Sequence, residues 1–227
     1  MAFDEALLDD AERTGRPTLR LYRWSPPCLS FGRNEPARSR YDRTAIERRG
    51  LDVVRRPTGG RAVWHDGEVT YAVAAPVAAF GTLAESYRAI HARLAAALRA
   101  LGVPADLAPP RRANPLGAGP CFAAPAGGEV VVEGRKVVGS AQVRRGTAFL
   151  QHGSILLDGS QDIINAVSRQ PSALTSATSL SAVLGRTIGF PEVAEAIIAA
   201  WGTTFTTLHP PPPSSTIFAS PDWTWRR

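Results

Sequence analysis

The chain has 227 residues, 44% of them hydrophobic, so it is long enough to bury one sizeable core. Its two cysteines provide no disulfide framework, and it lacks the run of about 18 apolar residues that a membrane span needs. The formal net charge of +6 favours encounters with acidic partners, although an arginine-rich composition is equally typical of a GC-rich genome. No zinc-ligand spacing, helix-turn-helix pattern or basic–aromatic interleaving indicates nucleic-acid binding.

The first half of the chain alternates predicted strands with three helices. The opening residues, MAFDEALLDD, are acidic where a signal peptide is basic, and we therefore expect a cytoplasmic protein. Hydrophobic spacing predicts helices over 2–13, over 42–49 with an end at Gly50, and over 83–101 with Gly102 as the C-terminal cap. Strands are predicted over 18–24, 28–32, 51–55, 62–64 and 69–74, with a tight turn at 57–60.

The second half begins with a connection rich in Pro, Ala and Gly that holds one short strand. Further strands are predicted over 121–123, 129–133, 136–144 and 148–157, with a tight turn at Gly134 and a break at Gly153. Helices over 161–167 and 191–205 precede four consecutive prolines, which are typical of a polyproline II spacer. Because strands and helices follow no regular βαβ alternation, we expect an α+β fold of mixed α/β layers. We expect one domain over 1–208, with the proline-rich spacer and C-terminal segment over 209–227 packed on it.

One cysteine and one lysine, Cys121 and Lys136, lie 15 residues apart across a predicted strand pair. Cysteine attacks as thiolate, and a neighbouring ammonium group lowers a thiol pKa from about 8.5 by stabilising the charged form. The two residues are therefore a candidate acyl-accepting nucleophile and its activating cation. A lone cysteine is more often a small buried hydrophobe, which is our interpretation of Cys28 in its apolar strand. Lys136 also fits a solvated position beside the turn at Gly134.

A glycine loop and two histidines form a second group of candidate residues. The run RRPTGGRAVWHD places two glycines between arginines, which suits a narrow acyl slot with exposed backbone N–H groups, but also suits a simple tight turn. His65 and His152 each fit either a binding site or a structural position, whereas His91 lies in a helical pattern and is interpreted as structural. The QHG run interrupts a strand with Gly153, as happens where the backbone approaches a ligand.

Several runs in order along the chain resemble one superfamily. GPCFAAP, VEGRKVVGSAQ and LQHGSILLD resemble the corresponding runs of the LipM-type octanoyltransferases, which belong to the lipoate/biotin protein ligase superfamily. RRPTGGRAVWHDGEVTYAV resembles the substrate-binding loop of that superfamily, and MAFDEALL resembles its opening helix. The resemblance extends from residue 1 to about residue 205, and SPDWTWRR resembles the family's terminus. ATP-using lipoate ligases share the other runs but generally lack the cysteine of the Cys-Phe pair.

The resemblance implies a fold, a reaction and a set of site residues. The fold would be a central mixed β-sheet flanked by helices, as in the biotin/lipoate ligase catalytic domain. The protein would transfer an octanoyl group from octanoyl-acyl carrier protein, through a thioester on Cys121, to a lysine of a lipoyl domain or of glycine cleavage H protein, in lipoate biosynthesis. Lys136 would hold the thiolate and carry protons, and no cofactor, ATP or metal would be needed. The implied substrate-binding residues are Arg56, Gly59, Gly60, Arg61, His65, Gly139, Ser140, Ala141, His152 and Gly153.

Three features depart from the family pattern. Ala123 replaces an acid that relatives can carry after the Cys-Phe pair, relatives usually begin with a strand ahead of the opening helix, and the proline run stands where we would expect a helix. Alternative functions are an ATP-dependent lipoate–protein ligase, an octanoyl amidotransferase acting between lipoyl proteins, and a non-catalytic protein that binds carriers or lipoyl domains. Biotin ligation is disfavoured because no GRGRxGR-type run occurs.

Overall fold

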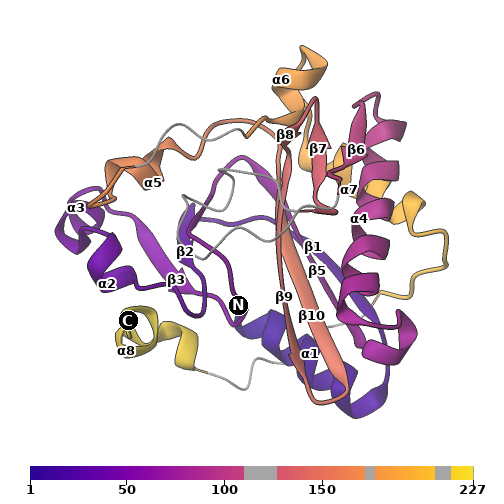
Figure 1. The fold of residues 1–227 in the computed structure, drawn as a ribbon, viewed down its shortest axis with the longest axis horizontal. Coiled ribbons are helices and arrows are strands. Elements are labelled where there is room, and N and C mark those ends of the chain that lie inside the picture. The colour runs from indigo at the N-terminus through magenta and orange to yellow at the C-terminus, as the bar shows by residue number, and fades with distance from the viewer. Residues whose placement is uncertain (110–126, 172–176, 208–215, 227) are drawn as a thin grey trace.

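The computed structural model describes residues 1–109, 127–171, 177–207 and 216–226. Its largest sheet is antiparallel and has the strand order β1-β5-β10-β9 (Figure 1). The two longest strands, β5 and β10, lie at its centre and are almost entirely buried. The strands of this sheet are β1 (Thr18–Tyr22), β5 (Glu68–Pro76), β9 (Val138–Arg145) and β10 (Ala148–Leu156).

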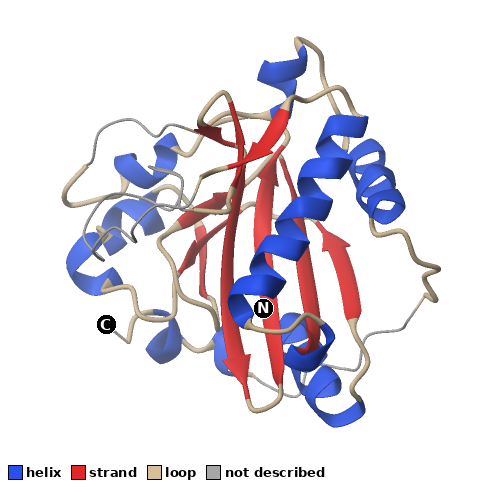
Figure 2. Ribbon diagram, turned by 45° about the vertical axis from the view of Figure 1, so that its right-hand side comes forward, coloured by secondary structure: helices blue, strands red, loops and turns tan. Residues whose placement is uncertain are grey.

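Helices cover both faces of the central sheet (Figure 2). Side chains alternate between the faces of a strand, so Ala72 and Ala74 of β5 meet α1 (Ala2–Thr14) on one side. Tyr71 and Val73 meet the other side, where α4 (Leu83–Ala100) and α7 (Phe190–Ala200) pack. The face of β5 with small alanine side chains therefore packs against α1 alone, and the face with larger side chains packs towards α4 and α7.

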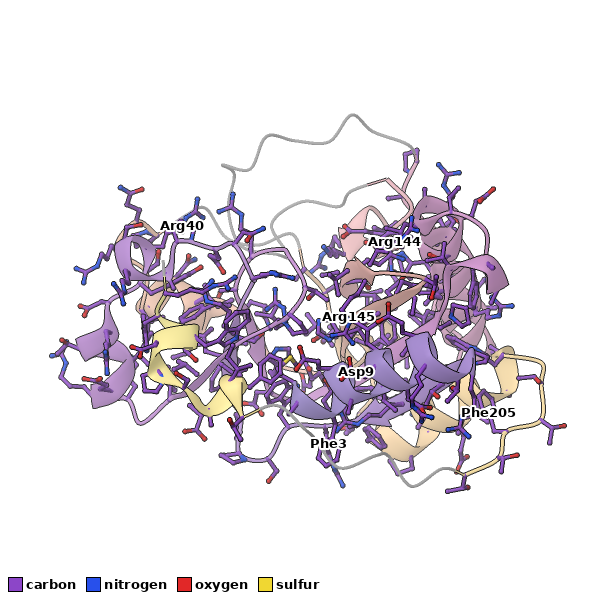
Figure 3. The ribbon with its side chains drawn as sticks, turned by 90° about the horizontal axis from the view of Figure 1, so that it is seen from below. Phe3, Asp9, Arg40, Arg144, Arg145 and Phe205 are labelled. Atoms are coloured by element: carbon purple, nitrogen blue, oxygen red, sulfur yellow. The ribbon has the colours of Figure 1, made fainter. Side chains whose placement is uncertain are left out.

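Helix α1 is also attached to the sheet by charge. Arg145, at the end of β9, forms ion pairs with Glu5, Asp9 and Glu12 along one face of α1 (Figure 3). These groups are partly exposed, so each pair stabilises the contact only weakly. These ion pairs help to position α1 on the sheet. The buried Asp4 of this helix reaches the candidate site, so the position of α1 affects the site.

A second sheet lies beside the first and has the order β3-β2-β4. Its strands β2 and β3 are parallel, whereas β2 and β4 are antiparallel. A separate apolar cluster around Leu29, Phe31 and Ile46 joins this sheet to the short helices beside it. These elements are β2 (Cys28–Phe31), β3 (Asp52–Arg55), β4 (Val63–His65), α2 (Ala37–Arg40), α3 (Arg43–Arg48) and α5 (Asp162–Ala166).

A third, small sheet packs against α4 and has the order β6-β7-β8. Its strands are β6 (Ala105–Leu107), β7 (Val130–Val132) and β8 (Arg135–Lys136), and Gly134 at the turn between the last two has φ 74°. The remaining short elements are η1 (Val77–Ala79), α6 (Leu180–Leu184), η2 (Ile217–Ala219) and α8 (Pro221–Thr224). No helix in the described ranges is both long enough and apolar enough to cross a membrane.

The structure confirms the predicted α+β fold and most element positions. Helix α4 is the longest described helix, begins at a capping box formed by Thr82 and Glu85, and ends before Gly102, whose φ is 85°. The side chain of Asp42 caps α3 by accepting a hydrogen bond from the amide of Ala45. The predicted division after residue 208 stays a prediction, because residues 208–215 lie outside the described ranges.

Three predictions about element boundaries are wrong. Strand β10 passes through Gly153 without a break. The predicted strand over 136–144 is two strands, because the chain changes sheets at Val137, whose N–H bonds to β7 and whose carbonyl bonds to β10. Helix α7 ends at Ala200, with Gly202 in the left-handed region at φ 62°, five residues before the predicted end at Phe205. The predicted strand over 121–123 lies outside the described residues.

Candidate functional site

A narrow cavity lies between the central sheet and the second sheet. It is lined by seven of the residues predicted for substrate binding, which the fold brings together from three parts of the chain. These seven residues are Arg56, His65, Gly139, Ser140, Ala141, His152 and Gly153. The sequence prediction did not include the other lining residues, which are Met1, Tyr22, Val63, Thr70 and Ser154.

The predicted residues of β9 and β10 face each other across one antiparallel pair. Ser140 lies opposite Gly153, and Ala141 lies opposite His152. A Cβ atom added at Gly153 would collide with the carbonyl of Gly139 and the hydroxyl of Ser140. Glycine is therefore required at position 153, because the backbone of β9 and the side chain of Ser140 come too close for a Cβ atom. Gly153 does not interrupt strand β10.

The loop that follows β3 folds around the guanidinium group of Arg56. Its Nη2 donates to the carbonyls of Arg61 at 2.7 Å and Gly59 at 3.2 Å, and its Nη1 donates to the carbonyl of Ser30 at 2.9 Å. Gly60 has φ 89° and faces both Arg56 and Ala141. The glycine loop is therefore held against the cavity by the arginine that precedes it. Gly59, Gly60 and Arg61 shape this wall and are not among the residues that line the cavity.

His65 belongs to a buried chain of polar groups at one wall. Its Nδ1 lies 2.7 Å from Oε1 of Glu68, and its Nε2 lies 2.5 Å from the hydroxyl of Ser30. Because the carboxylate can only accept, Nδ1 carries the proton and Nε2 accepts from Ser30. The same Oε1 accepts hydrogen bonds from Thr70 and from Ser154, at 2.9 Å for Ser154. This wall is consequently rigid and polar, and its imidazole has a fixed tautomer.

His152 is held in a similar way at the opposite wall. Its Nδ1 donates to Asp4 at 3.0 Å, and its Nε2 accepts from the hydroxyl of Thr58 in the glycine loop at 2.6 Å. Asp4 also accepts from Arg20 at 2.6 Å and from Tyr22 at 2.9 Å. Burial lowers the pKa of His152, although its bond to Asp4 acts against this, so the imidazole is neutral. Burial would raise the pKa of Asp4, but His152 and Arg20 together hold it well below its usual range.

A third buried network supports Ser140 from below the cavity. Its hydroxyl donates to Nε2 of His91 at 2.8 Å and accepts from the hydroxyl of Tyr71 at 2.6 Å, which in turn accepts from Gln151 at 2.9 Å. Nδ1 of His91 donates to the carbonyl of Gly128 at 2.7 Å. The burial of His91 agrees with its interpretation as a structural residue. Its hydrogen-bond partner Ser140, however, lines the cavity.

The burial of His91 predicts a loss of stability in mild acid. Burial lowers the pKa of His91 from 6.5 to about 4, so between these values the unfolded chain binds a proton that the folded chain does not. Stability must then fall as the pH falls, with this residue contributing about 2 kcal/mol between pH 7 and pH 5. Urea unfolding of wild type and His91→Gln at both pH values measures this, and the variant should lose less stability over the interval. Equal losses would show that His91 does not titrate as described.

Lys136 is buried, which contradicts the solvated-turn alternative. Its Nζ lies 2.7 Å from Oε1 of Glu129, and the side chains are 2% and 5% exposed. Tyr87 donates to the same carboxylate oxygen at 3.3 Å, and Glu129 directly follows the residue that His91 binds. The carboxylate stabilises the protonated ammonium group, so this pair places a paired cation beside the network that supports Ser140.

Lys136 is the only lysine in the chain, against 25 arginines. A structural cation could have been arginine, as it is everywhere else here, but a guanidinium group does not release its proton at physiological pH, whereas a buried ammonium group can. The sequence prediction of Lys136 came from its spacing to Cys121 and from the family resemblance, and the single occurrence of lysine is a further signal of the same position.

The two cysteines differ in what the structure says of them. Cys121, the predicted nucleophile, lies outside the described residues. Cys28 is buried on β2, where its Sγ lies 3.6 Å from the carbonyl of Leu29, and burial raises its pKa to about 12. Cys28 is therefore an unreactive thiol, as its apolar strand suggests. Among the described residues, no three His, Cys, Asp or Glu side chains gather as they would to hold a metal ion.

Two buried acids of the site were not predicted from the sequence. Asp4 lies in the first turn of α1, where an acid usually faces solvent and stabilises the helix N-terminus. Glu68 begins a long apolar strand and is 4% exposed. An acid in an otherwise apolar run must find partners when it is buried, and this is the signal that could have marked Glu68.

The chain is similar to proteins of the lipoate pathway. The family model for the lipoyl protein ligase A/B catalytic domain matches residues 1–202. An octanoyltransferase LipM from Moorella thermoacetica is 42% identical over 88% of this chain and 80% of its own length. A second, from Kyrpidia tusciae, is 49% identical over 76% of this chain and 66% of its own length.

Solved structures agree with the fold. A lipoate-protein ligase A bound with ATP has a TM-score of 0.74 at 24% identity, over 88% of this chain and 77% of that protein. The bi-partite lipoate protein ligase from Thermoplasma acidophilum has a TM-score of 0.74 at 22% identity, over 99% of this chain and 89% of that protein. The chain therefore belongs to the lipoyl protein ligase A/B catalytic domain family, and within it to the LipM-type octanoyltransferases.

Proposed function

We propose that this octanoyltransferase takes the octanoyl group from octanoyl-acyl carrier protein, holds it as a thioester on Cys121, and passes it to a lysine of a lipoyl domain or of glycine cleavage H protein. The observation that carries the proposal is the only lysine of the chain, buried and paired with Glu129 beside the cavity network, in a chain similar to LipM proteins. A cytoplasmic location, where both partners would be met, belongs to the same proposal.

The first step forms the acyl-enzyme. The thiolate of Cys121 attacks the thioester carbonyl of the carrier, and the carbon–sulfur bond to the carrier's thiol breaks. The ammonium group of Lys136 stabilises the attacking thiolate, and it gives a proton to the departing thiolate, which leaves Lys136 neutral for the second step. Backbone N–H groups of the glycine loop are the proposed donors to the negative oxygen of the tetrahedral intermediate.

The second step forms the amide. The acceptor lysine attacks the Cys121 thioester as a free amine, so a base must remove a proton from it as the carbon–nitrogen bond forms. Lys136 in its neutral form is that base, and the thiolate of Cys121 leaves. Conversion of a thioester into a second thioester and then an amide runs downhill. The reaction therefore needs no nucleotide.

The cavity is the proposed entry point of the acyl chain. Its lining on β9 and β10 includes Gly139, Ala141 and Gly153, whose side chains take up little room between the two sheets. Its polar walls are closed by bonds within the protein: His65 is bound by Glu68, and His152 by Asp4. Imidazole groups that are already hydrogen-bonded within the protein do not compete for the thioester.

A test with and without ATP separates this proposal from a ligase of the same fold. A transferase should modify a lipoyl domain from octanoyl-acyl carrier protein without nucleotide, and should release no pyrophosphate from ATP and free octanoate, because its donor is already activated. Mass spectrometry of the acceptor and a pyrophosphate assay measure both. Modification that occurs only from free acid with ATP would replace the transferase by the ligase. A second lipoyl protein as the only productive donor would indicate the amidotransferase.

A further inference from the structure

The last described segment of the chain, residues 216–226, packs against the strand that carries the substrate loop. Figure 1 shows α8 near β3, on the opposite side of the molecule from α7. Trp225 is buried, and its ring meets that of Phe31 edge-on at a centroid distance of 5.3 Å. The end of the chain therefore forms part of the core that supports β2 and β3.

Arg55 connects this segment to the site. It is fully buried, and its Nε donates to the carbonyl of Thr224 at 2.9 Å. Its Nη1 donates to the carbonyls of Gly32 at 2.6 Å and Glu35 at 2.8 Å. In return, Nε1 of Trp223 donates to the carbonyl of Arg55 at 3.0 Å. A planar guanidinium group with acceptors on several sides is fixed in one orientation, so segments far apart in sequence share one anchor.

Two of the residues that Arg55 holds just after β2, Gly32 and Arg33, touch the glycine loop. The amide of Arg33 donates to the carbonyl of Thr58 at 2.7 Å, and a side chain at Gly32 would collide with the carbonyl of Gly60. The amide of Arg56 donates to the carbonyl of Phe31 at 2.8 Å. A displacement of the segment after β2 would therefore displace the loop that forms the cavity wall.

We infer that the C-terminal segment sets the position of the substrate loop, with Arg55 as the positioning residue between them. Arg55 is the last residue of β3 and reaches the C-terminal segment, while Arg56, which follows the strand, reaches the loop and the cavity. The two consecutive arginines of the RRPTGG run thus have separate functions. Arg56 shapes the loop from within, and Arg55 fixes its base from behind.

The test is a single substitution, Trp223→Phe, which removes the indole N–H that binds Arg55 and keeps an aromatic ring beside Arg226. Hydrogen–deuterium exchange in peptides covering 31–35 and 55–61 should become about 5- to 10-fold faster, while β10 and α4 keep their protection. The KM for octanoyl-acyl carrier protein should rise by a similar factor, with kcat changed by less than about 3-fold. The matched control is Trp201→Phe at the end of α7, where neither quantity should change.

A second variant, Arg55→Lys, keeps the charge but loses the planar group of donors, and should produce the same pattern with larger effects. Faster exchange in 216–226 with unchanged exchange in 55–61 and an unchanged KM would overturn the inference. Equal acceleration across β10 and α4 would also overturn it, because Trp223 would then affect only global stability. The inference rests on the proposed function for its kinetic measurement alone. If wild type transferred no octanoyl group, the exchange measurement would still decide the matter.

Discussion

Replacing Cys121 with alanine is expected to reduce octanoyl transfer to a lipoyl domain by more than about 10³-fold, because the substitution removes the only atom proposed to carry the acyl group. The measurement is the initial rate of acceptor modification from octanoyl-acyl carrier protein, followed by mass spectrometry. Binding of the donor should persist, since the described residues that line the cavity between the two sheets are unchanged in this variant.

Cys28 provides a matched control. It is buried on β2, and burial raises its pKa to about 12, so it is a thiol at any physiological pH. Cys28→Ala should transfer octanoate at nearly the wild-type rate. If Cys121→Ala retained normal transfer, or if Cys28→Ala were the inactive variant, the thioester mechanism would have to be abandoned or moved.

Substitution of Lys136 should separate two roles of one side chain. Lys136→Met removes the cation and should raise the pH at which iodoacetamide alkylates Cys121 by about one unit or more. Lys136→Arg keeps the charge beside Glu129, so the alkylation profile should stay near that of wild type. Arginine cannot act as a base, however, so this variant should still transfer octanoate about 10²-fold more slowly.

Stability has to be controlled in the Lys136 experiments, because Lys136→Met alone leaves the buried carboxylate of Glu129 without its ion-pair partner. Loss of one member of a buried ion pair costs about 3–5 kcal/mol. The double variant with Glu129→Gln removes both charges and should recover part of that loss without restoring activity. As the only lysine, Lys136 gives a single side-chain resonance on ¹³C-lysine labelling, so its protonation can be followed directly by NMR. Identical alkylation profiles for wild type and Lys136→Met would place the lysine away from Cys121.

Much of the fold could be predicted from local sequence signals. The apolar periodicity of α4 and the glycine that ends it are local features of the sequence, and the structure confirms both. The change of sheet at Val137 could not be predicted, because it depends on which distant strand accepts each hydrogen bond. The glycine at position 153 predicts a strand break, which is wrong. Only the tertiary structure shows that Tyr71 and Ser140 occupy the space beside this glycine.

The candidate site shows a similar division. Runs that are continuous in sequence, such as the glycine loop and the stretch from Gly139 to Ala141, were predicted and lie on or beside the cavity. The pairings that fix them were not predicted, because Asp4 and His152 are 148 positions apart and Arg55 and Trp223 are 168 positions apart. Partner choice at such separations depends on packing, and local sequence patterns carry no information about it.

The most direct test of the mechanism is the intact mass of the protein after mixing with octanoyl-acyl carrier protein in the absence of an acceptor and of ATP. The thioester mechanism predicts an increase of about 126 Da, equal to one octanoyl group in place of a hydrogen atom, which hydroxylamine removes. The adduct should map to Cys121 and should disappear when a lipoyl domain is added. A protein that modifies the lipoyl domain under these conditions while never showing the adduct in rapidly quenched samples would contradict the mechanism.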